Sequence, residues 1–351
     1  MRDAPYNRHV SAPLRHDTPA LRQAWHSLCR SEDVTESPRS ERLLGELWVL
    51  WRDAEGTVRV FRDECPHRLA PLSLGQREQG GVRCAYHGWR FNESGTCVEI
   101  PALGADAAIP PKAKLRAPAA VLESHAMVFI APETPLTPRP LIAAANDASF
   151  QRGDLPVLRS RGNAGLLADN FLDVAHFPFV HAITFGADEA REVPQYRVER
   201  DGLSFSSVYE HDFANREDPG VAAGLRPLVQ RRRLTYRYTA PFHLELEIEF
   251  LDAGGSNVIG FFLTPEDQES VRIYSSLWRN DLESSSERMR QAIDFEVAVV
   301  TEDLALQSRY EDLALPLDTT REVHTRADRT TLELRRVLSD FVELASSAAH
   351  A

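Results

Sequence analysis

Two short groups of cysteine and histidine constrain this chain more than any other feature of its sequence. Cys65 and His67 are separated by one residue, and after sixteen further residues Cys84 and His87 are separated by two. Thiolate and imidazole are common metal ligands, and each group lies beside Gly or Pro, which favour turns. The four residues therefore predict a metal site built from two turns.

The way the ligands are paired separates two kinds of metal site. Tetrahedral zinc with two thiolates and two imidazoles is the simplest alternative, but zinc fingers usually pair cysteine with cysteine and histidine with histidine. Here each arm supplies one of each. A [2Fe-2S] centre of the Rieske type needs this mixture, because two thiolates bind one iron and two imidazoles bind the other. We therefore favour the iron–sulfur cluster over zinc.

The same stretch resembles the Rieske domain, in which Gly88 and Trp89 follow the second arm as they do here. High-potential Rieske proteins of respiratory complexes carry an extra cysteine in each loop. This chain has Leu69 and Ala70 after the first arm and Tyr86 inside the second, so the resemblance is to the oxygenase and ferredoxin branch. Cys97 lies outside both arms, and we expect it to be a small buried apolar residue.

Length and charge limit the possible classes of protein. The chain has 351 residues and is 43% hydrophobic, which is enough for two ordinary domains. Its formal net charge of -12 argues against binding to nucleic acid or anionic membranes. The one basic run, Arg231 to Arg233, lies in a strand-like segment and predicts a solvated face. Without a signal-like segment or a long apolar run, we expect a soluble, cytoplasmic protein.

The pattern along the chain predicts an α+β protein in three parts. We expect residues 1–20 to be loosely held. Residues 21–135 begin with a short helical pattern, 21–30, and continue as short alternating strands, which favours a small antiparallel β domain. A proline-rich linker at 132–140 leads into residues 136–351, where strands between 203 and 278 precede two helical segments, 283–311 and 328–344.

A second group of chemical residues lies in the apolar segment Asn170 to His181. Asp173, His176 and His181 could each be an ordinary core residue with a backbone partner. Three together are costly to bury unless they form a network or bind a metal. On one helix, Asp173 and His176 would share a face, whereas His176 and His181 would differ by about 140°. Pro178 would distort or break the helix between the histidines and allow them to converge, although such prolines also occur for packing alone.

Two histidines and a carboxylate form the facial triad of non-haem Fe(II) oxygenases. The stretch from Asp169 to His181 resembles the iron-binding motif of the Rieske non-haem iron oxygenases. In that family, the acid three residues before the first histidine is not a ligand but links a metal histidine to a Rieske histidine. The resemblance therefore assigns this linking role to Asp173, and it places Asn170 near the iron as a non-ligand.

The ligand carboxylate of that family comes from a helix far downstream. In this chain the corresponding element is Val299 to Gln307, and the resemblance assigns the ligand to Asp303 beside His176 and His181. Glu302 lies about 100° away around the helix, so both acids cannot easily face one iron. Glu302 as the ligand, or both acids as solvated charges, are the alternatives.

The resemblance implies an N-terminal Rieske [2Fe-2S] β domain followed by a helix-grip catalytic domain with one mononuclear Fe(II). It also implies a head-to-tail homotrimer in which His87 of one subunit passes electrons through Asp173, by way of His176, to the iron of its neighbour. The electrons would come from an NAD(P)H-linked flavin and iron–sulfur reductase or a ferredoxin, and O2 would be the co-substrate.

The chain most resembles the single-component group of vanillate, dicamba and methylxanthine demethylases. We therefore expect hydroxylation or oxidative O- or N-demethylation of a small aromatic or heterocyclic substrate. Ring cis-dihydroxylation and arylamine N-oxygenation are alternatives, and a non-catalytic Rieske electron carrier is a third. The pocket should be lined by the strands between 203 and 278 and by the helix that begins near 283.

Overall fold

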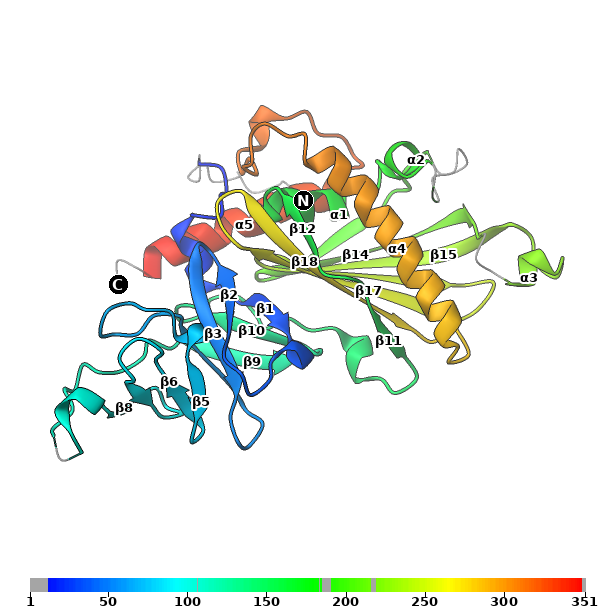
Figure 1. Cartoon of the computed structure of the whole chain (residues 1–351). Coiled ribbons are helices and arrows are strands. Elements are labelled where there is room, and N and C mark those ends of the chain that lie inside the picture. Colours follow the sequence, from blue (N-terminus) through cyan, green and yellow to red (C-terminus); the bar gives the residue numbers. More distant parts are fainter. Residues whose placement is uncertain (1–11, 106, 183, 185–190, 216–218, 349–351) are drawn as a thin grey trace. The chain divides into compact units, whose positions relative to one another are not determined.

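The computed structural model describes residues 12–105, 107–182, 184, 191–215 and 219–348 (Figure 1). The chain divides into two compact units. One comprises residues 21–135 together with 266–268, and the other comprises the remaining residues on either side.

Short strands joined by turns make up the unit of residues 21–135. They are β1 (His26–Arg30), β2 (Arg39–Leu43), β3 (Glu46–Arg52), β4 (Val58–Arg62), β5 (Gln76–Glu78), β6 (Gly81–Arg83), β7 (Arg90–Phe91), β8 (Cys97–Glu99), β9 (Ala120–Ser124) and β10 (Met127–Ala131). In the described part of this unit they form three antiparallel sheets, with the orders β1-β10-β9, β2-β3-β4 and β5-β6-β7-β8.

The helix expected over residues 21–30 is absent from this described stretch. A 3-10 turn, Pro19–Gln23, is followed instead by β1, which pairs with β10. His26 to Cys29 are all buried, so side chains on both faces of this strand are covered. A surface helix would bury only one stripe. Partners about a hundred residues later in the chain therefore override the local periodicity.

One hydrophobic core of this unit surrounds the predicted metal-binding cysteines. Trp51, Phe61 and Phe91 pack there with Cys65 and Cys84. Cys97 belongs to the same cluster and is buried, as expected for a small apolar residue. The cysteine sulfur atoms thus lie in an apolar interior.

The other unit is built on an antiparallel sheet that, in its described residues, has eight strands. They are β11 (Gln151–Asp154), β12 (Leu158–Arg161), β13 (Arg197–Asp201), β14 (Ser204–Ala214), β15 (Val229–Thr239), β16 (His243–Phe250), β17 (Ser256–Pro265) and β18 (Ser270–Arg279). The order is β11-β18-β17-β16-β15-β14-β13, and β12 also pairs with β18. The strands expected between residues 203 and 278 are therefore present.

Helices lie against one face of this sheet (Figure 1). The helices of the unit are α1 (Ala164–Leu172), α2 (Phe177–Val180), α3 (Pro219–Ala222), α4 (Ser286–Gln307) and α5 (Arg329–Ala348). On β15, alternate residues from Gln230 to Tyr238 are buried because successive side chains point to opposite faces of a strand. Among the described residues, no helix is both long and apolar enough to span a membrane.

Residues 12–20 are held in place, which differs from the loose segment expected over residues 1–20; residues 1–11 of that prediction lie outside the described part of the chain. The amide of Leu14 donates to the carbonyl of Leu315 at 2.8 Å, and the reverse bond measures 3.1 Å. His16 is buried and accepts a hydrogen bond from the amide of Ala164, the first residue of α1, at 2.8 Å. Partners far along the chain thus hold this segment, and the segment in turn caps α1.

α1 is fixed at its start and on its flank. The Asn163 side chain accepts a hydrogen bond from the amide of Gly165 at 2.7 Å, which satisfies one of the open amides of the first turn. On the flank, the buried guanidinium of Arg335 on α5 donates to Asp169 at 3.0 Å. These contacts set the position of the helix that leads into the second predicted metal site.

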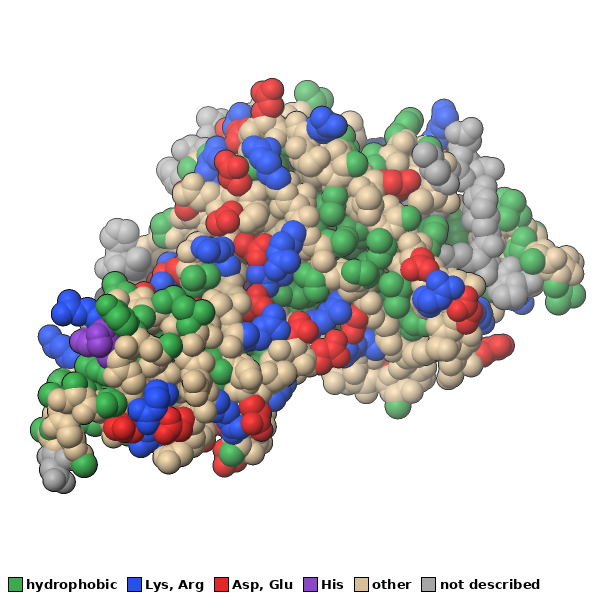
Figure 2. All heavy atoms as spheres, viewed as in Figure 1, with side chains coloured by type: hydrophobic (Ala, Val, Ile, Leu, Met, Phe, Trp, Pro, Cys, Tyr) green, Lys and Arg blue, Asp and Glu red, His purple; other side chains and the backbone are tan. Residues whose placement is uncertain are grey.

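Charged side chains of both signs are interspersed on the face shown in Figure 2. Ion pairs also link strands. In the unit of residues 21–135, for example, Arg83 on β6 pairs with Glu78 on the neighbouring β5 and with Glu99 on β8. These partly exposed pairs contribute little to stability individually, but together they keep the outer faces of the strands polar.

Candidate metal centres

The two cysteine–histidine arms occupy loops with the same backbone hydrogen bonds. In loop 65–70 the amide of the first residue donates to the carbonyl of the sixth at 2.8 Å, and the amide of the fifth donates to the carbonyl of the first at 2.8 Å. In loop 84–89 the same two bonds measure 2.9 and 3.0 Å. The fifth residue is left-handed in both loops, with φ of 58° at Leu69 and 70° at Gly88. The chain thus presents two equivalent turns.

The two turns direct thiols inward and imidazoles outward. Cys65 and Cys84 are buried in the apolar core, and burial raises the pKa of the Cys65 thiol to about 12. The rings of His67 and His87 meet edge to face with centroids 4.5 Å apart. Trp89 stacks on His67 at 4.6 Å. Because such a buried thiol ionises poorly alone, the arrangement suits thiolates that are stabilised by a bound metal.

The donor set fits a two-iron cluster better than a single zinc ion. Nδ1 of His67 is buried and has no hydrogen-bond partner, as expected for a nitrogen that binds metal. Tetrahedral zinc would hold its four donor atoms within about 3.8 Å of one another. In the described part of the chain, Cys65, His67, Cys84 and His87 do not form a group whose donor atoms all lie within 4.8 Å of one another. Two thiols on one side and two imidazoles on the other match a Rieske cluster.

The second predicted site lies at a break between two helices, not on one helix. α1 ends at Leu172, and Asp173 has extended backbone angles of φ -80° and ψ 123°. A new turn of helix, α2, begins at Phe177, with Pro178 at its start. A proline is tolerated there because its missing N–H would have no helical partner. The expectation that Asp173 and His176 share a helix face, and that Pro178 breaks the helix, was therefore wrong.

This break brings three predicted ligands together. Nε2 of His176 lies 3.1 Å from Nε2 of His181, and the two nitrogens lie 3.5 and 3.3 Å from Oδ1 of Asp303 on α4. One face of an octahedron with metal bonds of about 2.1 Å has edges of about 3.0 Å. The three donor atoms therefore lie close to the spacing of a facial triad, and the residues fit a mononuclear iron.

The charges of this site stabilise a cation at its centre. Burial alone would lower the pKa of His176, but the carboxylates of Asp173 and Asp303 raise it to about 9. Burial would raise the pKa of Asp303, but His176 and His181 lower it to about 2. A divalent metal that binds these two imidazoles and the ionised carboxylate would displace the protons from the imidazole nitrogens.

Neighbouring side chains orient these donors. Oε2 of Glu302 lies 2.8 Å from Nδ1 of His181, and the hydroxyl of Thr184 donates to the same carboxylate at 2.9 Å. The Asn170 side chain donates to Oδ1 of Asp303 at 3.3 Å. Glu302 thus faces the outer nitrogen of a histidine, as carboxylates around metal sites often do. Sequence reasoning weighed it only as a ligand or a solvated charge, and Thr184 was missed.

Asp173 lies on the outer side of the same site. Its Oδ2 is 3.6 Å from Nδ1 of His176, and its Oδ1 accepts a hydrogen bond from the amide of Ala175 at 2.8 Å. The side chain is 33% exposed, whereas that of His181 is only 1% exposed. Asp173 therefore contacts both an inner histidine and the surface.

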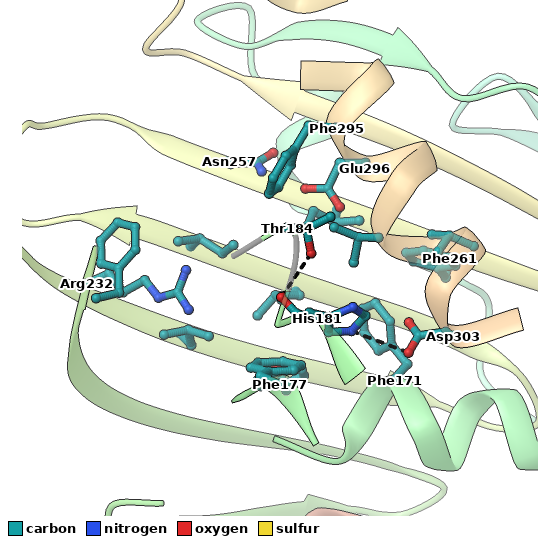
Figure 3. Close-up of a pocket in the computed structure, with 18 of the residues that line it drawn as sticks. Phe171, Phe177, His181, Thr184, Arg232, Asn257, Phe261, Phe295, Glu296 and Asp303 are labelled. Carbon is teal, nitrogen blue, oxygen red and sulfur yellow. Dashed lines mark hydrogen bonds and ion pairs between the residues drawn. The ribbon is translucent and has the colours of Figure 1, made fainter. Parts of the chain in front are cut away.

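A cavity of about 150 Å³ opens beside the three donors (Figure 3). Its walls are mostly apolar and come from the loop around α2, from β14 to β17 and from α4. The aromatic residues in the walls are Phe171, Phe177, Phe213, Tyr236, Phe250, Phe261 and Phe295. The predicted origin of the pocket, strands between 203 and 278 and the helix near 283, agrees with this lining.

One arginine of the basic run is part of this pocket, which corrects the expectation of a solvated face. Arg231 and Arg233 point outward and pair with Glu210. Arg232 is 8% exposed and lines the cavity. The signal was present in the sequence, because Arg232 alternates with Leu234 and Tyr236 at the spacing of one strand face.

Comparisons with known protein families identify both units of the chain. Residues 24–118 match the Rieske [2Fe-2S] domain, and residues 160–344 match the vanillate O-demethylase oxygenase C-terminal domain. The predicted α+β fold with an N-terminal Rieske domain is thereby confirmed.

Curated relatives and a solved structure agree with these matches. The toluene-4-sulfonate monooxygenase system iron–sulfur subunit of Comamonas testosteroni is 32% identical over 58% of this chain and 59% of its own length. The chain thus spans less than two thirds of that relative. The methylxanthine N3-demethylase NdmB of Pseudomonas putida is 28% identical over 92% of this chain and 90% of its own. The solved NdmB structure superposes with a TM-score of 0.80, 26% identity and coverage of 97% and 96%.

Proposed function

Since this chain belongs to the Rieske non-haem iron oxygenases, with a C-terminal domain of the vanillate O-demethylase type, we propose that it monooxygenates a small aromatic or heterocyclic substrate. The observation that carries this proposal is the triangle of donor atoms from His176, His181 and Asp303 beside an apolar cavity. An electron carrier needs neither feature.

The overall reaction consumes one O2 and two electrons. One oxygen atom enters a C–H bond of the substrate to give C–OH, and the other leaves as water, while NAD(P)H and one proton supply the reducing equivalents. If the oxidised carbon is a methyl group on oxygen or nitrogen, the hydroxymethyl product releases formaldehyde, which results in demethylation. The electrons enter through a separate reductase or ferredoxin.

In this proposal Cys65, His67, Cys84 and His87 hold the cluster, and His176, His181 and Asp303 hold the iron. When bound, the cluster supplies single electrons and the iron supplies open positions at which O2 is activated. The relatives named demethylase and monooxygenase components support this assignment of cofactors.

The chain itself orients ligands and excludes water. Glu302 and Thr184 hold His181 with its inner nitrogen directed at the centre, and Asn170 restrains Asp303. The apolar walls keep bulk water from the reacting carbon and limit side reactions of activated oxygen. The contacts of Glu302, Thr184 and Asn170 hold the donor side chains from outside the site, so the cavity stays available for O2 and substrate.

Asp173 connects the iron site to an electron donor in this proposal. Electrons would pass from His87 of the partner subunit through Asp173 to His176 in a head-to-tail homotrimer. The distance of 3.6 Å to His176 and the partial exposure of Asp173 support this role.

The test is the metal content of the purified protein and the fate of labelled oxygen. We expect about three irons and about two acid-labile sulfides per chain, together with a Rieske EPR signal. With ¹⁸O2, a hydroxylated product should carry one labelled atom. Two labelled atoms in a ring diol would favour cis-dihydroxylation, and a labelled nitroso or nitro product would favour N-oxygenation. A cluster without the additional iron would refute the oxygenase proposal in favour of an electron carrier.

A further inference from the structure

The guanidinium of Arg83 reaches across the second cysteine–histidine loop. Arg83 is the last residue of β6 and comes directly before Cys84. Its Nη1 donates to the carbonyl oxygen of Gly88, near the end of loop 84–89, at 2.7 Å. The Arg83 side chain is only 27% exposed. One cation therefore bridges the two ends of the loop that supplies Cys84 and His87.

Two carboxylates fix the rest of this guanidinium. Its Nη2 donates to Oε1 of Glu78 on β5 at 2.9 Å and to Oε2 of Glu99 on β8 at 2.9 Å. Its Nε also donates to Glu78. A planar fork that is held on several sides has few other conformations available to it. Arg83 is therefore a cation whose position is set by β5, β6 and β8 together.

The place of Arg83 in the sheet is unfavourable for stability alone. Arg83 lies directly opposite Arg90 on β7, and like charges that face each other across two strands destabilise a sheet. Glu99 offsets part of this repulsion, because its Oε2 also accepts a hydrogen bond from Nε of Arg90 at 3.0 Å. Natural proteins break such local rules mainly at functional sites, and here the exception adjoins the predicted ligand Cys84.

The Gly88 carbonyl connects Arg83 to the other arm of the cluster site. This carbonyl belongs to the peptide bond that leads into Trp89, whose own carbonyl accepts a hydrogen bond from the amide of Cys84 at 2.9 Å. The Trp89 ring stacks on His67 with centroids 4.6 Å apart and an interplanar angle of 8°. A shift of this peptide bond would therefore move a ring that packs flat against a ligand of the first loop.

The first loop carries the opposite charge at the corresponding position. The residue before Cys65 is Glu64, which pairs with Arg62 and Arg116. The two loops share their backbone hydrogen bonds, but the residue before the cysteine is an acid in one and Arg83 in the other. The cation is thus a property of the second arm and not of the turn that both arms share.

Building on the assignment of the cluster to these loops in the proposed function, we propose that Arg83 is a positioning residue that makes the cluster easier to reduce. Reduction adds one negative charge to the cluster, and a fixed cation beside its loop stabilises that charge. Hydrogen bonds and net charge around iron–sulfur clusters set their reduction potentials. Because the role depends on the planar fork that joins Gly88 to two carboxylates, lysine should replace Arg83 only in part.

The test measures the midpoint potential of the cluster in the metal-loaded full chain by spectroelectrochemical titration. In Arg83→Gln the equilibrium constant for one-electron reduction should fall by at least about tenfold, which corresponds to about 59 mV. Iron and sulfide contents should stay unchanged, which separates a shifted potential from loss of the cluster. In Arg83→Lys the equilibrium constant should fall by about threefold, because an ammonium group keeps the charge without the planar fork.

Arg90→Gln is the matched control, because it removes the same charge from the facing position of β7 and leaves the bond from Arg83 to Gly88 in place. The Arg90 guanidinium is held by Glu99 and Gln79, so its loss should change the reduction equilibrium by no more than about twofold. An unchanged potential in Arg83→Gln would overturn the proposal, and so would an equal fall in both variants. If Arg83→Gln does not retain its cluster, Arg83→Lys decides, and a potential equal to that of the unaltered protein would overturn the proposal.

The two proposals can fail separately. If Arg83→Gln lowers the potential but the protein lacks the additional iron, the oxygenase proposal fails and the role of Arg83 remains. If the protein contains that iron but its cluster potential does not depend on Arg83, the role of Arg83 fails and the oxygenase proposal remains.

Discussion

The two candidate metal centres are assembled in opposite ways. Each loop of the cluster site supplies a cysteine and a histidine within four residues and is closed by its own backbone hydrogen bonds. The iron site depends on α4, since 133 residues separate Asn170 from its partner Asp303. The first site therefore depends on local turn geometry, and the second depends on the packing of helices against a sheet.

The two centres also differ in their access to solvent. At the cluster loops His87 is exposed, and its neighbour Tyr86 is 65% exposed. At the iron site His181 is 1% exposed and an apolar cavity adjoins it. In the proposed function, electrons arrive from another protein, whereas the oxygen chemistry benefits from the exclusion of water. The difference in exposure matches the difference in task.

Removing a ligand from one of the two sites should remove the metal of that site and leave the metal of the other site bound. His181→Ala should lose the mononuclear iron and at least about a thousandfold in turnover, because the metal stabilises its transition state by several kcal/mol. The visible absorption and EPR signal of the cluster should persist. Cys84→Ser should give the reverse pattern, with the cluster lost and the iron site retained. Loss of both metals in either variant would contradict the independence of the two sites.

Replacing Asp173 should slow electron transfer from the cluster to the iron site without removing either metal. Asp173→Asn removes the charge beside His176, and we expect turnover to fall by about a hundredfold while iron and sulfide contents stay unchanged. Metal analysis and substrate-dependent NAD(P)H oxidation provide the two readouts. Asp212→Asn, at an exposed acid on β14, is the control and should behave like the unaltered protein. Normal turnover in Asp173→Asn would refute the linking role.

Replacing Glu302 tests whether the iron site depends on its surrounding contacts. Glu302→Gln keeps an acceptor near His181 but removes the charge, and we expect about a tenfold loss of Fe(II) affinity. Competition with a chelator measures this change, while the cluster spectrum should not respond. Glu311→Gln, an exposed acid just beyond α4, is the matched control. An unchanged affinity in Glu302→Gln would show that the hydrogen bond to His181 does not tune the site.

The free energy of unfolding of the two units should also respond differently to acid. This is the smallest of the expected effects. Burial and the charge of Arg232 lower the pKa of His211 from 6.5 to about 3, so the unfolded chain binds the proton more readily between these values. The contribution of His211 to the free energy of unfolding is fully present above pH 6.5 and is lost as the pH falls toward 3. Between pH 7 and about pH 5.5, the free energy of unfolding of the sheet unit should fall by about 1 kcal/mol.

In residues 21–135, burial tends to raise the pKa of Asp53, but hydrogen bonds from Thr57 and Arg59 outweigh burial and lower it from 3.8. Its contribution to stability is therefore lost only below about pH 4. Hydrogen exchange at several pH values can resolve the two units. His211→Gln should flatten the response of the sheet unit above pH 5, and an unchanged slope in that variant would contradict this account.

The sequence was most informative where structure is local. The spacing of Cys65, His67, Cys84 and His87 was enough to predict a metal site because each loop is determined by its own turn. The helix expected over residues 21–30 failed for the opposite reason, since β1 is stabilised by pairing with β10. Local periodicity cannot report a partner strand that lies about a hundred residues later.

At the iron site, too, the sequence did not predict contacts that depend on distant parts of the chain. His176, His181 and Asp303 could be proposed by resemblance, and the structure brings them together. The position of the helix break was not predicted, because an apolar run such as 170–181 has no periodicity that marks where one helix ends and another begins. The contacts of Glu302 and Thr184 depend on how α4 packs against the loop around α2, which residue spacing does not encode.

The contact between Leu14 and Leu315 has a consequence for how the chain matures during synthesis. Leu14 is synthesised roughly 300 residues before its partner Leu315, which corresponds to about 15 to 60 seconds of translation. Residues 21–135 have their own core, so they can fold and acquire a cluster during that interval. Residues 12–20 are thus made before the unit of residues 21–135 but pair with Leu315 only after it has been made, and their docking completes the cap on α1.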